Sequence, residues 1–83
     1  MLELRPGCEC CDRDLPPDAE AYLCTFECTW CPSCTESFAF ACPNCGGDLV
    51  RRPIRPAHLL ASNPASTVRV VAPGCADRLA AAG

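Results

Sequence analysis

Apolar residues along this chain come in short clusters and not in long periodic runs. The stretch from Ala21 to Cys24 predicts a short strand, and the stretch from Thr25 to Trp30 predicts a second strand that pairs with it as a hairpin. Pro32 suits the first position of a helix, so we expect residues 33 to 40 to form about two helical turns. The pattern therefore predicts a small, irregular α+β unit with one short hairpin and one short helix.

The pattern changes near residue 56. Residues 51–56 read RRPIRP, and because each proline pushes its predecessor out of the helical region, we expect an extended segment there. The chain beyond it is rich in small residues, is interrupted by prolines and lacks aromatic side chains. A short strand at residues 67–72 and a helical turn at residues 76–82 are suggested without an evident partner. We therefore predict a domain at residues 1–56 and a flexible tail at residues 57–83.

Composition makes a conventional core unlikely to suffice for this chain. The 83 residues are 49% hydrophobic, but cysteine and alanine make up more than half of that share. Small domains with few large apolar side chains usually need metal ions or covalent cross-links. The aromatic side chains all lie between the first and the last cysteine pairs, so metal and core are expected to coincide: Tyr22, Phe26, Trp30, Phe38 and Phe40.

Eight of the ten cysteines form four pairs with the spacing C-x2-C-x12-C-x3-C-x2-C-x2-C-x7-C-x2-C. The last pair is followed by two glycines, and Gly46 is expected to take the positive-φ position of a tight knuckle. Four thiolates complete one tetrahedral zinc site, so eight predict two Zn²⁺ ions. In a sequential arrangement the first two pairs share one ion and the last two share the other. In a cross-braced arrangement the pairs alternate, and the short gap between Cys28 and Cys31 favours it because those ligands can belong to interleaved sites. Cross-bracing assigns zinc 1 to Cys8, Cys11, Cys31 and Cys34, and zinc 2 to Cys24, Cys28, Cys42 and Cys45.

Three further residues carry metal-binding chemistry outside this pattern. Cys10 lies between Cys8 and Cys11 and is either an exposed bystander or an alternate ligand that also offers a redox or metal-transfer thiol. Cys75 is expected to be a free thiol without a role. His58 is the single histidine, and we do not expect it to bind metal because the eight cysteines already complete two sites.

Charge is distributed unevenly around a formal net value of −3. Residues 1–50 carry nine acids and two arginines, and two four-thiolate zinc sites would make this half still more negative. Such a surface disfavours nucleic acid. The basic cluster of Arg51, Arg52 and Arg55 is expected either to be attracted to the acidic half or to contact an anion. No signal peptide or membrane-spanning stretch is recognised, which predicts a cytoplasmic protein whose cysteines are reduced and bind metal.

The cysteine spacing over residues 8–45 resembles that of the RING finger, with Cys28 where most members have histidine and with Pro43 after the seventh ligand. Glu9 occupies the position at which ubiquitin-ligase RING fingers carry an apolar contact for the conjugating enzyme. A closer resemblance covers residues 1–56. Their opening MLELRPGCECCDRDLPP and closing CPNCGGDLVRRPIRP are similar to a bacterial family, domain of unknown function 1272. That resemblance implies a bacterial source and no established activity.

Zinc that is bound by four thiolates has no open position for water, and such sites are structural. The sequence shows no catalytic constellation, so a non-enzymatic role is expected. We interpret the chain as a zinc-binding adaptor module that presents an acidic surface to a protein partner, with no membrane or nucleic-acid partner. The alternative is a cysteine-rich metal buffer or thiol redox sensor, and a ubiquitin-ligase-like activity comes third.

Overall fold

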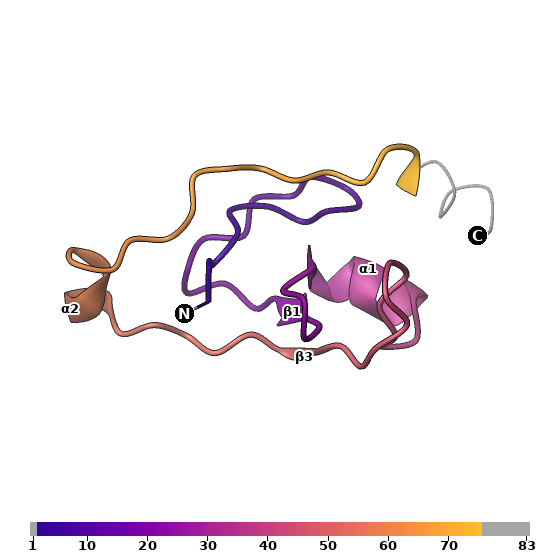
Figure 1. Ribbon diagram of the computed structural model, residues 1–83, viewed down its shortest axis with the longest axis horizontal. Helices are drawn as coiled ribbons and strands as arrows, with labels where there is room; N and C mark the ends of the chain where they lie inside the picture. The colour runs from indigo at the N-terminus through magenta and orange to yellow at the C-terminus, as the bar shows by residue number, and fades with distance from the viewer. Residues whose placement is uncertain (1, 76–83) are drawn as a thin grey trace.

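Three strands of two residues each form the sheet at the centre of the molecule. The computed structural model describes residues 2–75, and its longest dimension is 42 Å against 20 and 17 Å for the others (Figure 1). The sheet order is β2-β1-β3, and both pairings are antiparallel. Tyr22 lies opposite Trp30 on one side and opposite Arg51 on the other. The strands are β1 (Tyr22–Leu23), β2 (Thr29–Trp30) and β3 (Val50–Arg51).

The expected hairpin is formed by β1 and β2, although its strands are shorter than the sequence suggested. The chain between them is a turn in which the Glu27 amide donates to the Cys24 carbonyl. Glu27 itself has a φ of 63°, a left-handed conformation that cannot continue a strand. The third strand, β3, was expected only as an extended segment, because its pairing with β1 connects residues far apart along the chain.

Helix α1 (Pro32–Ser37) begins where the sequence predicted and ends earlier. Pro32 opens the helix, and the Cys31 side chain caps it by accepting from the Cys34 amide. The helix stops at Phe38 because Ala39 and Phe40 have φ values of 53° and 61°. This left-handed turn directs the chain into the last cysteine pair.

Two loops of the same backbone design carry the first and last cysteine pairs. We call residues 7–14 the first knuckle and residues 41–48 the second knuckle, and an isolated β-bridge joins the two ends of each. In both knuckles the amide of the first cysteine donates to the carbonyl of the residue five positions later. The carbonyl of the same cysteine accepts from the amide of the residue four positions later. That fourth residue is left-handed in both knuckles: Asp12 with a φ of 61°, and Gly46 with a φ of 76°, as its sequence context predicted.

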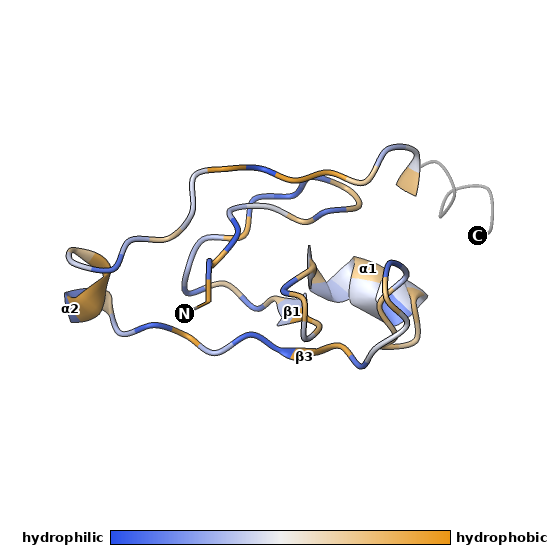
Figure 2. Ribbon diagram, in the orientation of Figure 1, coloured by the Kyte–Doolittle hydropathy of each residue, from blue (hydrophilic) through white to orange (hydrophobic). Residues whose placement is uncertain are grey.

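The core is small and consists mainly of cysteine. Trp30 is fully buried and packs edge-on against Phe38, with ring centroids 5.1 Å apart. Its burial rules out the exposed docking role that a tryptophan can also play. Apolar positions form short stretches along a largely polar chain and no element is apolar throughout (Figure 2). The aliphatic members of the core are Leu15, Ala21 and Leu49.

Beyond β3 the chain extends to a second helix, turns and comes back along the molecule. Helix α2 (Ala57–Leu60) was not anticipated. Residues 64–75, which we call the return strap, then run beside the N-terminal segment (Figure 1). The Ser66 amide donates to the Glu3 carbonyl, and the Ala72 amide to the Glu9 carbonyl. The strand expected at residues 67–72 is an extended segment here, and the helical turn at 76–82 lies outside the described residues. The division into residues 1–56 and a flexible tail at 57–83 stays a prediction.

Two members of the basic cluster, Arg52 and Arg55, bind backbone carbonyls. Arg52 is 2% exposed, and its guanidinium donates to the carbonyls of Arg5, Leu15 and Pro16. Arg55 donates to the carbonyls of Leu2, Asn63 and Pro64. Burial lowers the pKa of Arg52, because removal from water disfavours the charged guanidinium. Arg52 and Arg55 therefore tie residues 51–56 to the N-terminal part of the chain, and Arg55 also ties them to the start of the return strap.

Candidate metal centres

The first cysteine cluster joins the first knuckle to the start of α1. Its sulfur atoms all lie within 4.8 Å of one another, and the Sγ atoms of Cys11 and Cys31 are 3.7 Å apart. Zinc–sulfur bonds of about 2.3 Å in a tetrahedron place sulfurs about 3.8 Å apart. The donor set therefore fits a single tetrahedral metal ion. Its members are Cys8, Cys11, Cys31 and Cys34.

The second cysteine cluster joins the turn between β1 and β2 to the second knuckle. The sulfur atoms of Cys24, Cys28 and Cys42 lie within 4.8 Å of one another. Cys45 is exposed and falls outside this tight set. Its thiol still interacts with the thiols of Cys24 and Cys42. The second cluster thus presents three grouped thiols with a fourth at its edge.

The two clusters alternate along the chain. The first cluster takes its sulfurs from the first and third cysteine pairs, and the second from the second and fourth, with Cys45 at the margin. The cross-braced arrangement requires this grouping. In the sequential arrangement, each cluster would instead have joined two neighbouring pairs. Because β2 and α1 connect the clusters directly, displacing either one would disturb the other.

Backbone amides point at one sulfur of every cysteine pair. Such hydrogen bonds favour the thiolate, because they stabilise negative charge on sulfur. All four have a nitrogen–sulfur distance of 3.4 Å, and in addition Asn44 Nδ2 lies 3.6 Å from Cys28 Sγ. The amide donors and their sulfur acceptors are Cys10 to Cys8, Phe26 to Cys24, Cys34 to Cys31, and Gly47 to Cys45.

Each cluster contains thiols with opposite tendencies to ionise. Burial opposes ionisation of Cys24 and Cys31, but nearby amides and thiols more than offset it, so both pKa values are lowered. Burial and the charge on Cys24 raise the pKa of Cys28 to about 11, although Asn44 opposes the rise. Burial and the neighbouring Cys31 raise the pKa of Cys34. Without a cation, these thiols cannot all be ionised together; a divalent cation supplies the missing charge.

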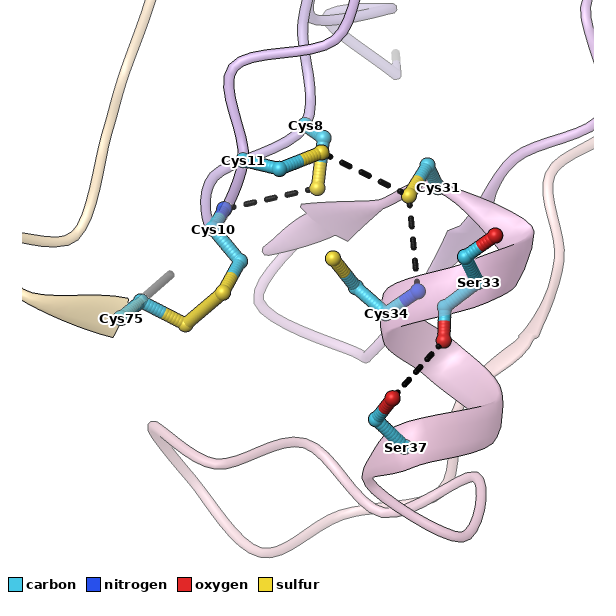
Figure 3. The surroundings of a disulfide bond; sticks show 8 residues. All are labelled: Cys8, Cys10, Cys11, Cys31, Ser33, Cys34, Ser37 and Cys75. Atoms are coloured by element: carbon cyan, nitrogen blue, oxygen red, sulfur yellow. Dashed lines mark hydrogen bonds between the residues drawn. A yellow bond between two sulfur atoms is a disulfide. The ribbon is translucent and has the colours of Figure 1, made fainter. Parts of the chain in front are cut away.

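Cys10 and Cys75 were interpreted wrongly from the sequence. Cys10 is not exposed, and Cys75 is not a free thiol: each is 3% exposed, and they form a disulfide across 65 residues (Figure 3). While that bond exists, Cys10 cannot serve as an alternate ligand. The eight paired cysteines are free of disulfides, as expected. His58 lies on the exposed surface of α2, outside both clusters. One indication of this bond was visible in the sequence: two cysteines remain outside the four pairs.

Glu9 was the other residue whose environment the sequence did not reveal. It is 3% exposed, and its Oε2 accepts from the Arg5 guanidinium and from the Thr29 amide, both at 2.6 Å. Glu9 thereby ties the first knuckle to β2. A buried carboxylate cannot offer the surface contact that ubiquitin-ligase RING fingers provide at this position. Among residues 2–75, no helix has the length and apolar character needed to cross a membrane.

Comparison with known proteins agrees with the resemblance read from the sequence. The model of a family described as "Protein of unknown function (DUF1272)" matches residues 1–55. An uncharacterized protein from Rhizobium meliloti (strain 1021) is 63% identical over 84 residues, which cover 98% of this chain and 100% of that protein. The similarity therefore extends through the return strap. No solved structure matches. On the extent of the family match and the identity to this relative, the chain belongs to the DUF1272 family.

Proposed function

We propose that this protein is a zinc-stabilised binding module, in which one Zn²⁺ ion in each cysteine cluster fixes the fold and leaves the surface free to bind a protein partner. The observation that carries the proposal is the pair of interleaved thiol clusters with an amide directed at a sulfur of every pair. In the second cluster Cys45 would be the fourth ligand. Four thiolates leave no position for water, so the ions would act structurally and RING-like cross-bracing would follow.

The weakness of the rest of the fold supports a structural role for the metal. The strands have two residues each and α1 has six, lengths at which neither element is stable alone. Structural zinc contributes about 10–16 kcal/mol per site to folding in small zinc-finger peptides. Two such ions would hold together segments that the small core cannot.

A groove beside the second cluster supports a binding role. It has a volume of about 460 Å³, and its apolar lining includes Leu23 and Val50, the latter 57% exposed. Glu27 and Asp48 lie at the same groove. We call this surface the acidic groove. An apolar floor with acidic neighbours suits a peptide that carries an apolar side chain flanked by lysine or arginine.

Native mass spectrometry during zinc titration tests the metal part of the proposal. Two ions should bind, and removing them with a chelator should abolish the fold in one cooperative step, followed by circular dichroism and NMR dispersion. A stoichiometry other than two contradicts the assignment. A metal buffer would instead bind a variable number of ions and show little change in fixed structure.

A peptide array tests the binding part. Apolar peptides flanked by basic residues should bind, whereas the same peptides flanked by acidic residues should not. Val50→Asp should weaken binding about tenfold, because it places a charge on the groove floor. Val68→Asp is the matched control, since Val68 is 66% exposed on the return strap and does not line the groove. Equal binding by the two variants would contradict the assignment of the acidic groove.

A further inference from the structure

The disulfide lies on the side of the first knuckle that faces away from the first cysteine cluster. The Cys10 side chain points toward Cys75, whereas the four cluster cysteines lie together beside α1 (Figure 3). Cys10 and Cys75 nevertheless belong to the same buried core as Cys8, Cys31 and Cys34. The bond therefore attaches the end of the return strap directly to the loop that carries two of the cluster sulfurs.

Non-covalent contacts hold the return strap against the first knuckle in addition to the disulfide. The Ala72 amide donates to the Glu9 carbonyl at 2.6 Å. Arg69 reaches both the Asp12 side chain and its carbonyl, at 2.9 and 2.7 Å, and pairs with Asp14 at 3.0 Å. Its guanidinium lies so close to Gly7 that a Cβ there would be 2.5 Å from Nη2. Gly7 therefore makes room for the strap.

These contacts are too exposed to hold the return strap firmly by themselves. The side chains of Arg69, Asp12 and Asp14 are 37%, 51% and 83% exposed, and ion pairs in such surroundings contribute little. The contacts would keep Cys75 near Cys10, and in the bonded state the Cα atoms of the two cysteines are 4.9 Å apart. Whether the strap stays in place then depends on the covalent bond.

The redox state of Cys10 can affect the first cluster through the backbone amide of the same residue. The Cys10 amide donates to Cys8 Sγ at 3.4 Å, and Cys8 is fully buried. Ala72 of the return strap packs against the same core. Releasing the strap would loosen the loop that positions this amide and would uncover the core beside Cys8.

We propose that Cys10 and Cys75 form a reversible redox site that closes the return strap against the first knuckle and so controls how readily the first cysteine cluster exchanges its metal. In closing, the two thiols react with a low-molecular-weight disulfide such as oxidised glutathione. One sulfur–sulfur bond forms in the protein, the bond in the small disulfide breaks, and two electrons and two protons leave with two small thiols. Reduction by the small thiol reverses the step. The metal-exchange part rests on the proposed zinc binding.

Zinc release from the full chain, loaded with metal, tests this inference. The oxidised and the phosphine-reduced protein are mixed with a chromogenic chelator, and release is followed by absorbance. One ion should leave at least about tenfold faster from the reduced protein, and the other should leave at the same rate in both states. Alkylation of the released thiols followed by peptide mass mapping should identify the faster site as Cys8, Cys11, Cys31 and Cys34.

Two variants separate the bond from the contacts that align it. Cys75→Ser should release the first ion rapidly whether or not oxidant is present. Arg69→Ala keeps both thiols, so its oxidised form should behave as the wild type, whereas the bond should form more slowly with oxidised glutathione because Cys75 is less well aligned. Native mass spectrometry of wild type and Cys75→Ser should first show two ions bound in each.

The outcomes distinguish the two proposals. Fewer than two ions in every redox state would contradict the proposed function. Two ions with release rates that do not depend on the redox state, or a Cys75→Ser variant that behaves as the oxidised wild type, would overturn the redox site alone. Loss of metal on oxidation would likewise overturn it, since the oxidant would then have reached the cluster thiols in place of Cys10 and Cys75.

Discussion

The first and second knuckles share one backbone design but have different surroundings. Both are closed by a β-bridge, and both place a left-handed residue directly after the cysteine pair. The position before the second cysteine differs: Cys10 in the first knuckle bonds to Cys75, whereas Asn44 in the second donates to Cys28 Sγ. The first knuckle thus anchors a distant segment of the chain, whereas the second knuckle hydrogen-bonds a neighbouring thiol.

The sulfur that accepts a backbone amide also differs between the two knuckles. In the first it belongs to Cys8, which is fully buried. In the second it belongs to Cys45, which is exposed. In both knuckles the first cysteine is buried and the second is exposed, so the two loops direct their amide to opposite positions of the pair. Coverage of the individual sulfur should therefore determine how much each cysteine contributes to stability and to holding its metal.

The largest expected difference comes from removing one ligand from each knuckle. Cys8→Ser should lose one zinc ion and most of the fixed structure, because a buried serine hydroxyl replaces a thiolate in the closed cluster. Cys45→Ser should retain two ions with weaker binding at the second, since solvent can complete the site at its exposed edge. Native mass spectrometry and circular dichroism at several zinc concentrations measure both effects. Equal losses in the two variants would contradict the role assigned to coverage.

Arg52 tests the connection between the two knuckles. It follows the second knuckle and β3, and its guanidinium binds carbonyls just outside the first knuckle. Arg52→Ala should lower the free energy of unfolding by about 3 kcal/mol, because it leaves buried carbonyls without donors and creates a cavity. Arg51→Ala, at an exposed position, is the matched control and should have little effect. Urea denaturation of the zinc-loaded proteins measures both.

A smaller effect is expected from the left-handed position of the second knuckle. Gly46 has a φ of 76°, and an added Cβ would meet no atom within 4 Å. Gly46→Ala should therefore cost only the conformational penalty, about 1 kcal/mol. Gly46→Asn should cost less, because asparagine tolerates this region as Asp12 does in the first knuckle. Thermal unfolding with zinc in excess checks the order, and a loss larger for asparagine than for alanine would contradict it.

The smallest effect should come from the ion pairs over the first knuckle. Arg69→Ala removes contacts with Asp12 and Asp14 that are largely in solvent, so it should lower the stability only slightly, and less at high salt. Arg13→Ala, exposed on the same knuckle, serves as the control. Unfolding in low and high salt separates the electrostatic part. A loss that does not change with salt would show that Arg69 acts through packing against Gly7.

Local features of the fold followed from the sequence, because neighbouring residues determine them. The pair spacing placed the cysteines in knuckles, Pro32 marked the start of α1, and Gly46 was expected to be left-handed. The membership of the DUF1272 family and the small irregular α+β fold were confirmed. The metal identity and the adaptor role stay predictions.

The features that the sequence did not reveal depend on contacts between distant residues. β3 pairs with β1 across a gap that includes α1 and the second knuckle, so its register has no local signal. The Cys10–Cys75 bond depends on the return strap, which is aligned by Arg69 and by two backbone hydrogen bonds. Arg52 was expected to be attracted to the acidic half or to contact an anion, but its partners are backbone carbonyls, which the order of side chains does not reveal.

The alternation of the cysteine clusters has a consequence for how the chain is made. The N-terminus leaves the ribosome first, so the first cluster stays incomplete until Cys34 has emerged. The second cluster must wait for Cys42, and the strap can close only after Cys75. Incomplete sets of thiols are therefore exposed in the nascent chain. Assembly would proceed in that order, with the covalent closure coming last.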